Sequence, residues 1–276
     1  MEVSPMLNEW INKTFVVTGA AQGQGAAEAI KLLNLGARVI ALDLHSPESV
    51  IWDNIKDHIE QKDLNNLIVF ELDISQPTQW ENLVEYINIH KVKINGLINN
   101  AGITLRKTVT KTSPVEWNNL MSINLNGAFY GIHFLAPLME DNSSIVNISS
   151  TAGLTGYFSA AYTTSKWGLR GLTKAAAIEL ANRNIRVNTV CPGLVETPMM
   201  MEANTEHNAE KAKAFHEGNR QATPLARGAS PEEIAEVALF LLSDKSSYIN
   251  AADIPVDGGM IGGGIYWRIG KMTGDV

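Results

Sequence analysis

The sequence predicts an α/β fold in which a doubly wound parallel sheet of seven strands is flanked by helices. Short β-branched runs alternate with longer amphipathic segments, which is typical of parallel strands joined by helices. A glycine-rich turn follows the first of these runs directly. Residues 13–259 contain no internal repeat, low-complexity linker or shift in composition, so we expect a single domain over that range.

Seven segments have the length and the β-branched content of strands. They are Thr14–Thr18, Ala37–Leu42, Leu67–Leu72, Gly96–Asn99, Ser144–Ser149, Ile185–Val190 and Asp253–Val256.

Two helix starts carry the capping-box pattern, in which a Ser precedes a Pro and a Glu follows three residues after the Ser. The pattern occurs at Ser113 and at Ser230. Outside the predicted domain lie an N-terminal extension, residues 1–12, and an apolar, glycine-rich C-terminal tail, residues 260–276. Both ends could tether a neighbouring subunit, and Tyr266 and Trp267 of the tail could either close a pocket or form a surface contact.

Composition and charge narrow the class of protein. Of the 276 residues, 45% are hydrophobic and 18% are charged, which is an ordinary globular balance. The net charge of −7 argues against nucleic-acid binding, which needs clustered basic side chains. The single cysteine, Cys191, cannot form an internal disulfide, and we find no secretory signal or membrane span. We therefore expect a cytoplasmic protein with no membrane partner, and no His cluster suggests a metal.

The turn after the first predicted strand reads TGAAQGQG and leads into a predicted helix over Ala26–Leu35. Glycine lets the backbone approach a pyrophosphate, and the helix start offers unpaired N–H groups to its charge. The spacing differs from the widespread G-x-G-x-x-G fingerprint, so a tight turn without a ligand is the alternative for this stretch alone. The cofactor-binding candidates here are Gly19, Gln22, Gly23, Gln24 and Gly25.

Polar residues end the following strands, at the edge where open α/β sheets bind ligands. Asp43 lies eighteen residues after Gly25, where a carboxylate accepts hydrogen bonds from the adenosine ribose. Its charge would repel the 2′-phosphate of NADP, and no Arg or Lys follows it through Val50, so NAD(H) is favoured. Asp73 could accept a hydrogen bond from the adenine amine. For Asn99 and Asn100, the alternative to cofactor binding is a turn, which Asn and Gly favour. Further candidates are Leu44, Asp73, Ile74, Asn100, Ala101 and Gly102.

The chemistry is indicated by Ser149-Ser150 and by YTTSK, residues 162–166, in a predicted helix over Ala160–Ala181. Four-residue spacing places Tyr162 and Lys166 on one helix face. A nearby ammonium lowers the pKa of a tyrosine from its usual value of about 10. A serine hydroxyl can then hydrogen-bond the substrate oxygen while hydride moves to or from carbon. By itself a Tyr and Lys four apart is a common surface pair, but with the glycine turn it predicts an alcohol/ketone oxidoreductase.

The segments TGAAQGQG, NNAG, NISS, YTTSK and CPGLVETP resemble, in order and approximate spacing, those of the short-chain dehydrogenase/reductase family over roughly residues 13–259. The resemblance implies a Rossmann-type fold and a Tyr162 that acts as general acid/base. It implies that Lys166 lowers the tyrosine pKa and holds the nicotinamide ribose. Asn124 resembles the helix-kinking Asn that anchors a proton-relay water, with Asn126 as its rival.

The resemblance also makes Ser150 the substrate-orienting hydroxyl. The interval from Ser150 to Tyr162 is one residue shorter than the family pattern, and Ser149 would restore it. We prefer Ser150 because Gly153 keeps its usual place. After the sixth predicted strand the resemblance implies cofactor contacts from Pro192, Gly193, Val195 and Thr197.

The stretches ISSTAGLTG, YTTSKWGLRGLTKAAAIEL and IRVNTVCPGLVETPM are most similar to bacterial 3α/20β-hydroxysteroid dehydrogenases, which implies a steroid carbonyl and a homotetramer. A lid is expected at about residues 196–220, where adaptable methionines suit a bulky apolar ligand or simply fill the core. The substrate-binding candidates are Ser150, Leu154, Tyr157, Tyr162 and Met199.

Two alternatives stay open. One is an enzyme for another secondary alcohol, such as a 3-oxoacyl thioester, a sugar or a cyclic alcohol. An acyl-carrier reductase is expected to prefer NADPH and to present a basic docking patch. Asp43 and the acidic net charge count against this alternative. The other is a non-catalytic NAD(H)-binding sensor, which the intact Asn, Ser, Tyr and Lys set disfavours.

Overall fold

A computed structural model describes residues 9–201 and 209–276 of the chain. Its strands form one sheet in the order β3-β2-β1-β4-β5-β6-β7, and every neighbouring pair is parallel. The chain reverses direction across the sheet between β1 and β4, which is the topological switch point of a doubly wound fold. The fold class predicted from the sequence is confirmed.

The strands lie close to their predicted positions, and two begin earlier than predicted. Residues 139–143 form the start of the fifth strand, although their mostly polar sequence lacks the β-branched content that predicts a strand. Met139 pairs with Ile94 at the start of the fourth strand, across a register shift. The strands are β1 (Thr14–Thr18), β2 (Arg38–Asp43), β3 (Leu67–Glu71), β4 (Ile94–Asn99), β5 (Met139–Ile148), β6 (Arg186–Pro192) and β7 (Asp253–Val256).

Helices connect the strands and cover both faces of the sheet. They are α2 (Gly23–Asn34), α3 (Asp53–Lys56), α4 (Pro77–His90), α5 (Pro114–Met121), α6 (Gly127–Leu135), α7 (Ala160–Glu179), α8 (Pro198–Met201), α9 (Ala209–Ala222), α10 (Pro231–Leu242) and α11 (Met260–Thr273). The predicted capping boxes are confirmed, because Ser113 and Ser230 each cap their helix reciprocally with a Glu at the third position.

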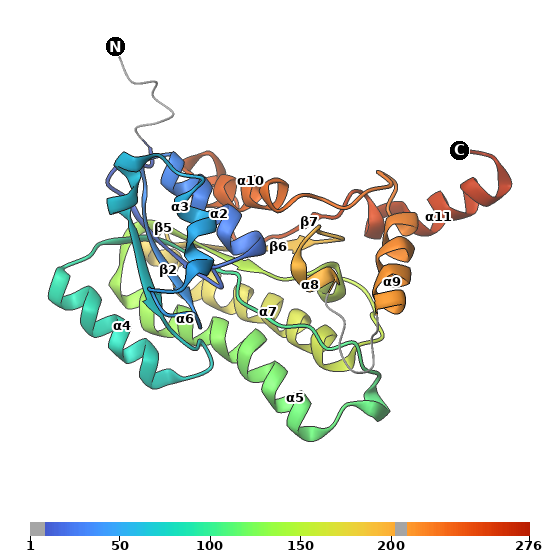
Figure 1. Ribbon diagram of the computed structural model, residues 1–276, viewed down its shortest axis with the longest axis horizontal. Helices are drawn as coiled ribbons and strands as arrows, with labels where there is room; N and C mark the ends of the chain where they lie inside the picture. The colour runs from blue at the N-terminus through green and yellow to red at the C-terminus, as the bar shows by residue number, and fades with distance from the viewer. Residues whose placement is uncertain (1–8, 202–208) are drawn as a thin grey trace, which may run out of the picture.

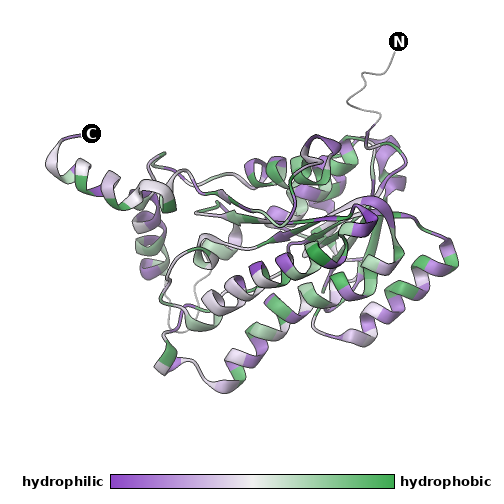
Figure 2. Ribbon diagram, turned by 180° about the vertical axis from the view of Figure 1, so that it is seen from behind, coloured by the Kyte–Doolittle hydropathy of each residue, from purple (hydrophilic) through white to green (hydrophobic). Residues whose placement is uncertain are grey.

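The helices form two layers, with α2, α3 and α10 on one face of the sheet and α4, α6 and α7 on the other (Figure 1). Apolar side chains of β1 alternate between the two layers: Val17 joins the core beneath α2 and α10, and Val16 joins the core beneath α4 and α7. Figure 2 shows the same division, with hydrophobic strands between helices whose outer faces are hydrophilic.

The two ends of the chain differ in how they contact this body. Trp10 of the extension is buried and its ring lies 5.4 Å from that of Phe15 in β1. In contrast, α11 projects away from the sheet beyond α9 (Figure 1). Tyr266 is 80% exposed, and Trp267 stacks under the Lys271 ammonium at 4.5 Å, so neither closes the protein's own cavity.

Parallel strands bring their carboxyl ends to a common edge. The glycine turn after β1, Asp43 at the end of β2, Asn100 after β4 and Ser150 after β5 therefore meet there. Within the described residues, no helix has the length and apolarity needed to cross a membrane. The same part of the chain holds no group of His, Cys, Asp or Glu suited to a metal ion.

Candidate active site

The glycine turn is held in place by the residues that follow β4. The Asn100 side chain donates to the carbonyls of Thr18 and Gly19 at 3.1 and 3.2 Å. The backbone N–H groups of Asn100 and Ala101 donate to the Thr18 hydroxyl, both at 3.0 Å. Gly19 has a φ of +64°, and a Cβ there would lie 2.8 Å from the Ala101 Cα, so only glycine fits.

The start of α2 has the properties of an anion site. Its N-cap residue, Gln22, makes no side-chain capping bond, and the first turn contains no acidic residue. The N–H groups and the positive end of the helix dipole therefore suit a pyrophosphate. The Gln24 side chain reaches the cavity described below, and its Oε1 is buried without a hydrogen-bond partner in the described structure. The predicted dinucleotide cofactor therefore fits these residues.

Asp43 joins this turn to the end of β2. Its Oδ2 accepts from the Ala21 backbone N–H at 3.1 Å, and its Oδ1 accepts from the Leu44 N–H at 2.8 Å. The His45 Nδ1 lies 2.7 Å from the same Oδ1, a contact that the sequence pattern did not predict. The Leu44 side chain is 67% exposed, so only its backbone belongs to the cluster.

The predicted cofactor contacts after β3 have other structural roles here. The Asp73 Oδ1 accepts from the backbone N–H and hydroxyl of Ser75 at 2.9 and 2.7 Å, which forms the turn before α4. The Ile74 side chain is buried against Gly127, where a Cβ would lie 2.5 Å from the Ile74 Cδ1. A cofactor contact by either residue stays a prediction.

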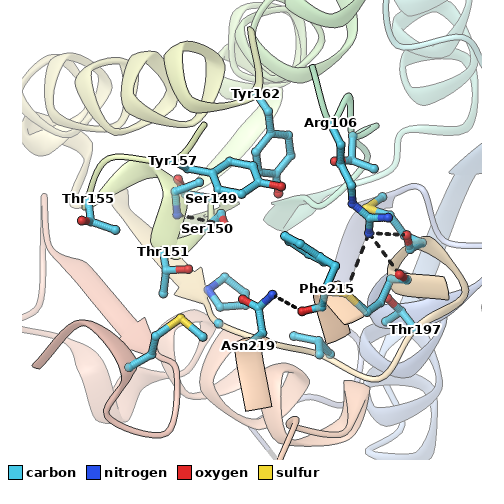
Figure 3. A pocket seen from close by; sticks show the side chains of 18 of the residues that line it. Arg106, Ser149, Ser150, Thr151, Thr155, Tyr157, Tyr162, Thr197, Phe215 and Asn219 are labelled. Atoms are coloured by element: carbon cyan, nitrogen blue, oxygen red, sulfur yellow. Dashed lines mark hydrogen bonds between the residues drawn. The ribbon is translucent and has the colours of Figure 1, made fainter. Parts of the chain in front are cut away.

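A cavity of about 240 Å³ opens beside the ends of β5 and β6. Ser150 and Tyr162 line it together with Tyr157, and Figure 3 shows all three hydroxyl-bearing side chains at one wall. The candidates after β6 line it as well, which brings the predicted nicotinamide end and the predicted chemical end together. These are Pro192, Gly193, Val195 and Thr197.

The two serines after β5 have different partners. The Ser149 hydroxyl is buried and donates to the Lys166 backbone carbonyl at 3.0 Å. The Ser150 hydroxyl accepts from the Ala152 N–H at 3.1 Å and is near enough to the Tyr162 hydroxyl to favour a lower pKa of that group. Gly153 allows this arrangement, since a Cβ there would lie 2.7 Å from the Ser149 Oγ. Both serines line the cavity with Tyr162, and the choice of Ser150 as the substrate-orienting hydroxyl stays a prediction.

Lys166 has a different geometry from the one predicted for it. Its Nζ donates to the Ile148 carbonyl at 2.8 Å and lies 5.7 Å from the centroid of the Tyr162 ring. Burial lowers the pKa of Lys166 to about 8.

Burial also raises the pKa of Tyr162, against the opposing effects of the Ser150 hydrogen bond and the Arg106 charge. The predicted lowering of the tyrosine pKa by Lys166 stays a prediction, because the groups that shift the pKa of Tyr162 here do not include Lys166. Its ammonium is directed at a backbone carbonyl, and desolvation of the phenolate is the larger effect.

Asn124 is buried next to this site, whereas Asn126, the alternative candidate, is exposed. Asn124 belongs to a π-helical segment, Ser122–Asn126, which links α5 to α6. Its Oδ1 accepts from the Ile103 N–H at 2.8 Å, and its Nδ2 donates to the Ile103 carbonyl at 2.9 Å and to the Ser165 hydroxyl at 3.3 Å. A Cβ on Gly102 would lie 3.2 Å from the Asn124 Oδ1 and 3.6 Å from the Lys166 Nζ, so these groups are close neighbours.

The predicted substrate wall is partly different in the structure. Tyr157 and Met199 line the cavity, but Leu154 does not, because the 3-10 turn Thr151–Gly153 directs Thr151 and Thr155 toward it instead. Sequence reasoning missed lining residues from distant segments, namely Thr104, Arg106, Phe215, Asn219 and Met260. Part of the predicted lid, residues 202–208, lies outside the described residues.

Comparison with known proteins gives a consistent result. A family profile described as enoyl-(acyl carrier protein) reductase matches residues 19–261. The chain is 37% identical over 254 residues to a 3-oxoacyl-[acyl-carrier-protein] reductase of Thermotoga maritima, covering 90% of this chain and 98% of the relative.

It is 36% identical over 255 residues to a trans-4-hydroxycyclohexanecarboxylate dehydrogenase of Sinomonas cyclohexanicum, with 91% and 93% of the two chains covered. Identity to a 3-alpha-(or 20-beta)-hydroxysteroid dehydrogenase of Mycobacterium bovis is 34% over 262 residues, with 94% and 93% covered. Among solved structures, levodione reductase superposes with a TM-score of 0.81 at 29% identity, covering 90% of this chain and 97% of that one.

Proposed function

Because the chain belongs to the short-chain dehydrogenase/reductase family, whose oxidoreductases act on alcohols, we propose that it interconverts a secondary alcohol and a ketone with NAD(H) as cofactor. The observation that carries the proposal is the convergence of Ser150 and Tyr162 at the wall of a cavity that also reaches Thr197. Two hydroxyls converging on one point suit a substrate oxygen whose charge changes during reaction.

In the proposed reaction the cofactor, when bound, supplies or accepts the hydride. Tyr162 donates the proton to the substrate oxygen in reduction and takes it back in oxidation. Ser150 holds that oxygen through a second hydrogen bond. Lys166 would bond the nicotinamide ribose of a bound cofactor, and Asn124 connects the site to Ser165 and the loop at Ile103 as an anchor for a proton relay.

Asp43 supports the preference for NAD(H). Its carboxylate stands at the end of β2, close to the start of α2, and is held there by backbone N–H groups. A phosphate at the ribose 2′ position would meet this negative charge, whereas a ribose hydroxyl can donate to it.

For the substrate we propose a cyclic alcohol or ketone, with a hydroxysteroid as the first candidate. Sequence similarity to hydroxysteroid and hydroxycyclohexanecarboxylate dehydrogenases supports a ring. The cavity of about 240 Å³ is smaller than the usual lower size of about 300 Å³ for ligand pockets, so its volume favours a small ring over a steroid.

A substrate panel tests the proposal. Hydroxysteroids, small cyclic ketones and a 3-oxoacyl thioester are assayed in both directions with NAD(H) and NADP(H), following the absorbance of the reduced nicotinamide. We expect turnover of at least one ring ketone with a higher kcat/KM for NADH than for NADPH. Cofactor binding without turnover across the panel would instead support a sensor.

A further inference from the structure

His45 stands beside the carboxylate that is proposed to bind the cofactor ribose. Its Nδ1 lies 2.7 Å from the Asp43 Oδ1, and its side chain is 42% exposed, whereas that of Asp43 is 12% exposed. An ionised carboxylate only accepts hydrogen bonds, so the ring carries a hydrogen on Nδ1. The other ring nitrogen, Nε2, is then an acceptor when the imidazole is neutral and a donor when it is charged.

The contacts of Asp43 limit how many further donors its carboxylate can bind. Its Oδ1 accepts from His45 and from the Leu44 N–H, and its Oδ2 accepts from the Ala21 N–H. A carboxylate offers about four acceptor positions, so these contacts fill three of them. The remaining position, on Oδ2, suits one ribose hydroxyl. A ribose held there lies within the screening length of about 8 Å from His45, so the charge of the ring acts on any phosphate that the ribose carries.

The other ionisable groups around the His45 ring are acidic. The glycine turn that packs against Asp43 contains no charged side chain. On the neighbouring strand, Glu71 is the register partner of Asp43 and is exposed, and Asp73 accepts from its own turn. Glu48 is exposed further along the loop that carries His45. Carboxylates of ordinary pKa are ionised where an imidazole titrates, between about pH 5 and 8, so the ring is the group whose charge changes in that range.

We infer that His45 determines how strongly the protein discriminates between NAD(H) and NADP(H). As a neutral ring it leaves the Asp43 charge to repel the 2′-phosphate. As an imidazolium it offsets that charge and donates from Nε2 to the phosphate. The inference rests on the proposed use of NAD(H) and deepens it, because it makes the preference for NAD(H) weaker in acid.

Two nucleotides without nicotinamide test the inference in the unmodified protein and need no turnover. Adenosine 5′-monophosphate and adenosine 2′,5′-bisphosphate are titrated calorimetrically at about pH 8 and about pH 5.5, with NADH and NADPH as the larger pair. We expect the dissociation constant of the bisphosphate, relative to that of the monophosphate, to fall by about threefold to tenfold toward acid. Added salt should reduce the fall, because ions screen the charge. The same ratio at both pH values would overturn the inference and leave the proposed function intact.

Variants of His45 separate the ring from the phosphate, which itself loses charge below about pH 6. His45→Gln cannot take up a proton, so the fall that remains in this variant is due to the phosphate and should be smaller than in the parent. His45→Arg is charged throughout and should already favour the bisphosphate at about pH 8. Equal falls in His45→Gln and in the parent would overturn the inference.

His58→Gln is the matched control. His58 is also exposed, but its ring bonds the Asn54 carbonyl at 2.7 Å, and its backbone contacts Asn34 at the opposite end of α2 from the glycine turn. This variant should show the same fall as the parent. A fall as small as that of His45→Gln would mean that the pH dependence does not come from the contact with Asp43, against the inference.

A second readout uses the reciprocity between proton binding and ligand binding. If the charged ring binds the 2′-phosphate, then the bound phosphate must make the ring easier to protonate. The His45 ring resonance, identified by its loss in His45→Gln, is followed by NMR against pH. Its midpoint should be about 0.5 to 1 unit higher with saturating bisphosphate than with saturating monophosphate. Equal midpoints would refute the inference, whereas failure of every ketone in the substrate panel would count against the proposed function alone.

Discussion

At the scale of single residues, the proposed chemistry depends most on the hydroxyl of Tyr162. Tyr162→Phe keeps the ring that faces Tyr157 at 6.2 Å and removes only the proton donor. We expect kcat to fall by about 10²- to 10⁴-fold or more, the usual effect of losing a general acid/base. NADH binding, followed by fluorescence titration, should be nearly unchanged. A near-native kcat with native cofactor affinity would contradict the mechanism.

Ser149 and Ser150 form a natural pair of variants at this scale. Ser150→Ala removes the cavity hydroxyl proposed to hold the substrate oxygen beside Tyr162, and it should reduce kcat strongly with little change in thermal stability. Ser149→Ala removes a buried bond to the Lys166 carbonyl and should lower the unfolding free energy by about 1 kcal/mol while keeping most of the turnover. Initial rates and urea denaturation measure the two effects. The reverse assignment would be indicated if Ser149→Ala alone abolished turnover.

Asp43 determines the cofactor preference in the proposed site. Asp43→Asn keeps an oxygen to accept from the Ala21 N–H but removes the negative charge. Adding Leu44→Arg at a position that is 67% exposed supplies a charge for a 2′-phosphate. We expect the ratio of kcat/KM for NADPH over NADH to rise in the single variant and further in the double variant. If the ratio stayed the same in both, Asp43 would not contact the ribose.

At the scale of secondary-structure elements, α2 contains a buried acid with no role in the proposed reaction. Glu28 is fully buried, neither carboxyl oxygen has a hydrogen-bond partner in the described structure, and burial raises its pKa well above the usual value. The folded protein therefore retains a proton that the unfolded chain releases near pH 4.5. The stability contribution of this group is complete below the unfolded pKa and is lost as the pH rises through the folded pKa.

Glu28→Gln tests this consequence, because it keeps the shape of the side chain and cannot ionise. The unfolding free energy of the variant relative to the parent should increase between about pH 5 and pH 8, by at most about 1.4 kcal/mol per pH unit. Urea denaturation across that range measures it, with Glu85→Gln at an exposed position of α4 as the control. Parallel pH profiles for Glu28→Gln and the parent would show that Glu28 is ionised in the folded protein.

At the scale of the whole molecule, the projecting α11 presents an apolar surface that the described chain does not cover. Ile265, Ile269 and Met272 are 75%, 49% and 81% exposed. We propose that a second copy of the chain covers this surface in a homo-oligomer, with a tetramer as the expected state. Exposed apolar patches on soluble proteins commonly mark such contacts.

Replacing Ile265 and Ile269 together by Lys should reduce the molar mass measured by light scattering to that of a smaller assembly. The circular dichroism spectrum should stay native, because both side chains are exposed. An exposed pair on α10, Glu232→Lys with Glu236→Lys, serves as a control for added positive charge. An unchanged molar mass in the α11 variant would exclude this helix as the subunit contact.

The sequence alone was sufficient for the order and type of the elements. Strand runs such as Thr14–Thr18 and Asp253–Val256 were predicted at the positions where the structure has them. Thr14–Thr18 is buried throughout, and such a strand needs a continuous apolar, β-branched run. The capping boxes at Ser113 and Ser230 could also be predicted, because each is formed by residues only three positions apart in the sequence. Asp43 and Asn100 could also be placed at one sheet edge, because parallel strands all end there.

Only the tertiary structure decided which side chains act on one another. Ser149 and Ser150 are adjacent in sequence, but the Ser149 hydroxyl donates to the Lys166 carbonyl of α7 whereas the Ser150 hydroxyl accepts from the Ala152 N–H, and the turn at Gly153 allows this difference. The direction of the Tyr162 pKa shift depends on burial and on where the Lys166 ammonium points, neither of which has a sequence period. Arg106 meets Phe215 across more than a hundred residues, and a contact between two loops or helices of different segments leaves no pattern along the chain. Local propensity and periodicity therefore determined the scaffold, whereas the electrostatics of the cavity came from long-range packing.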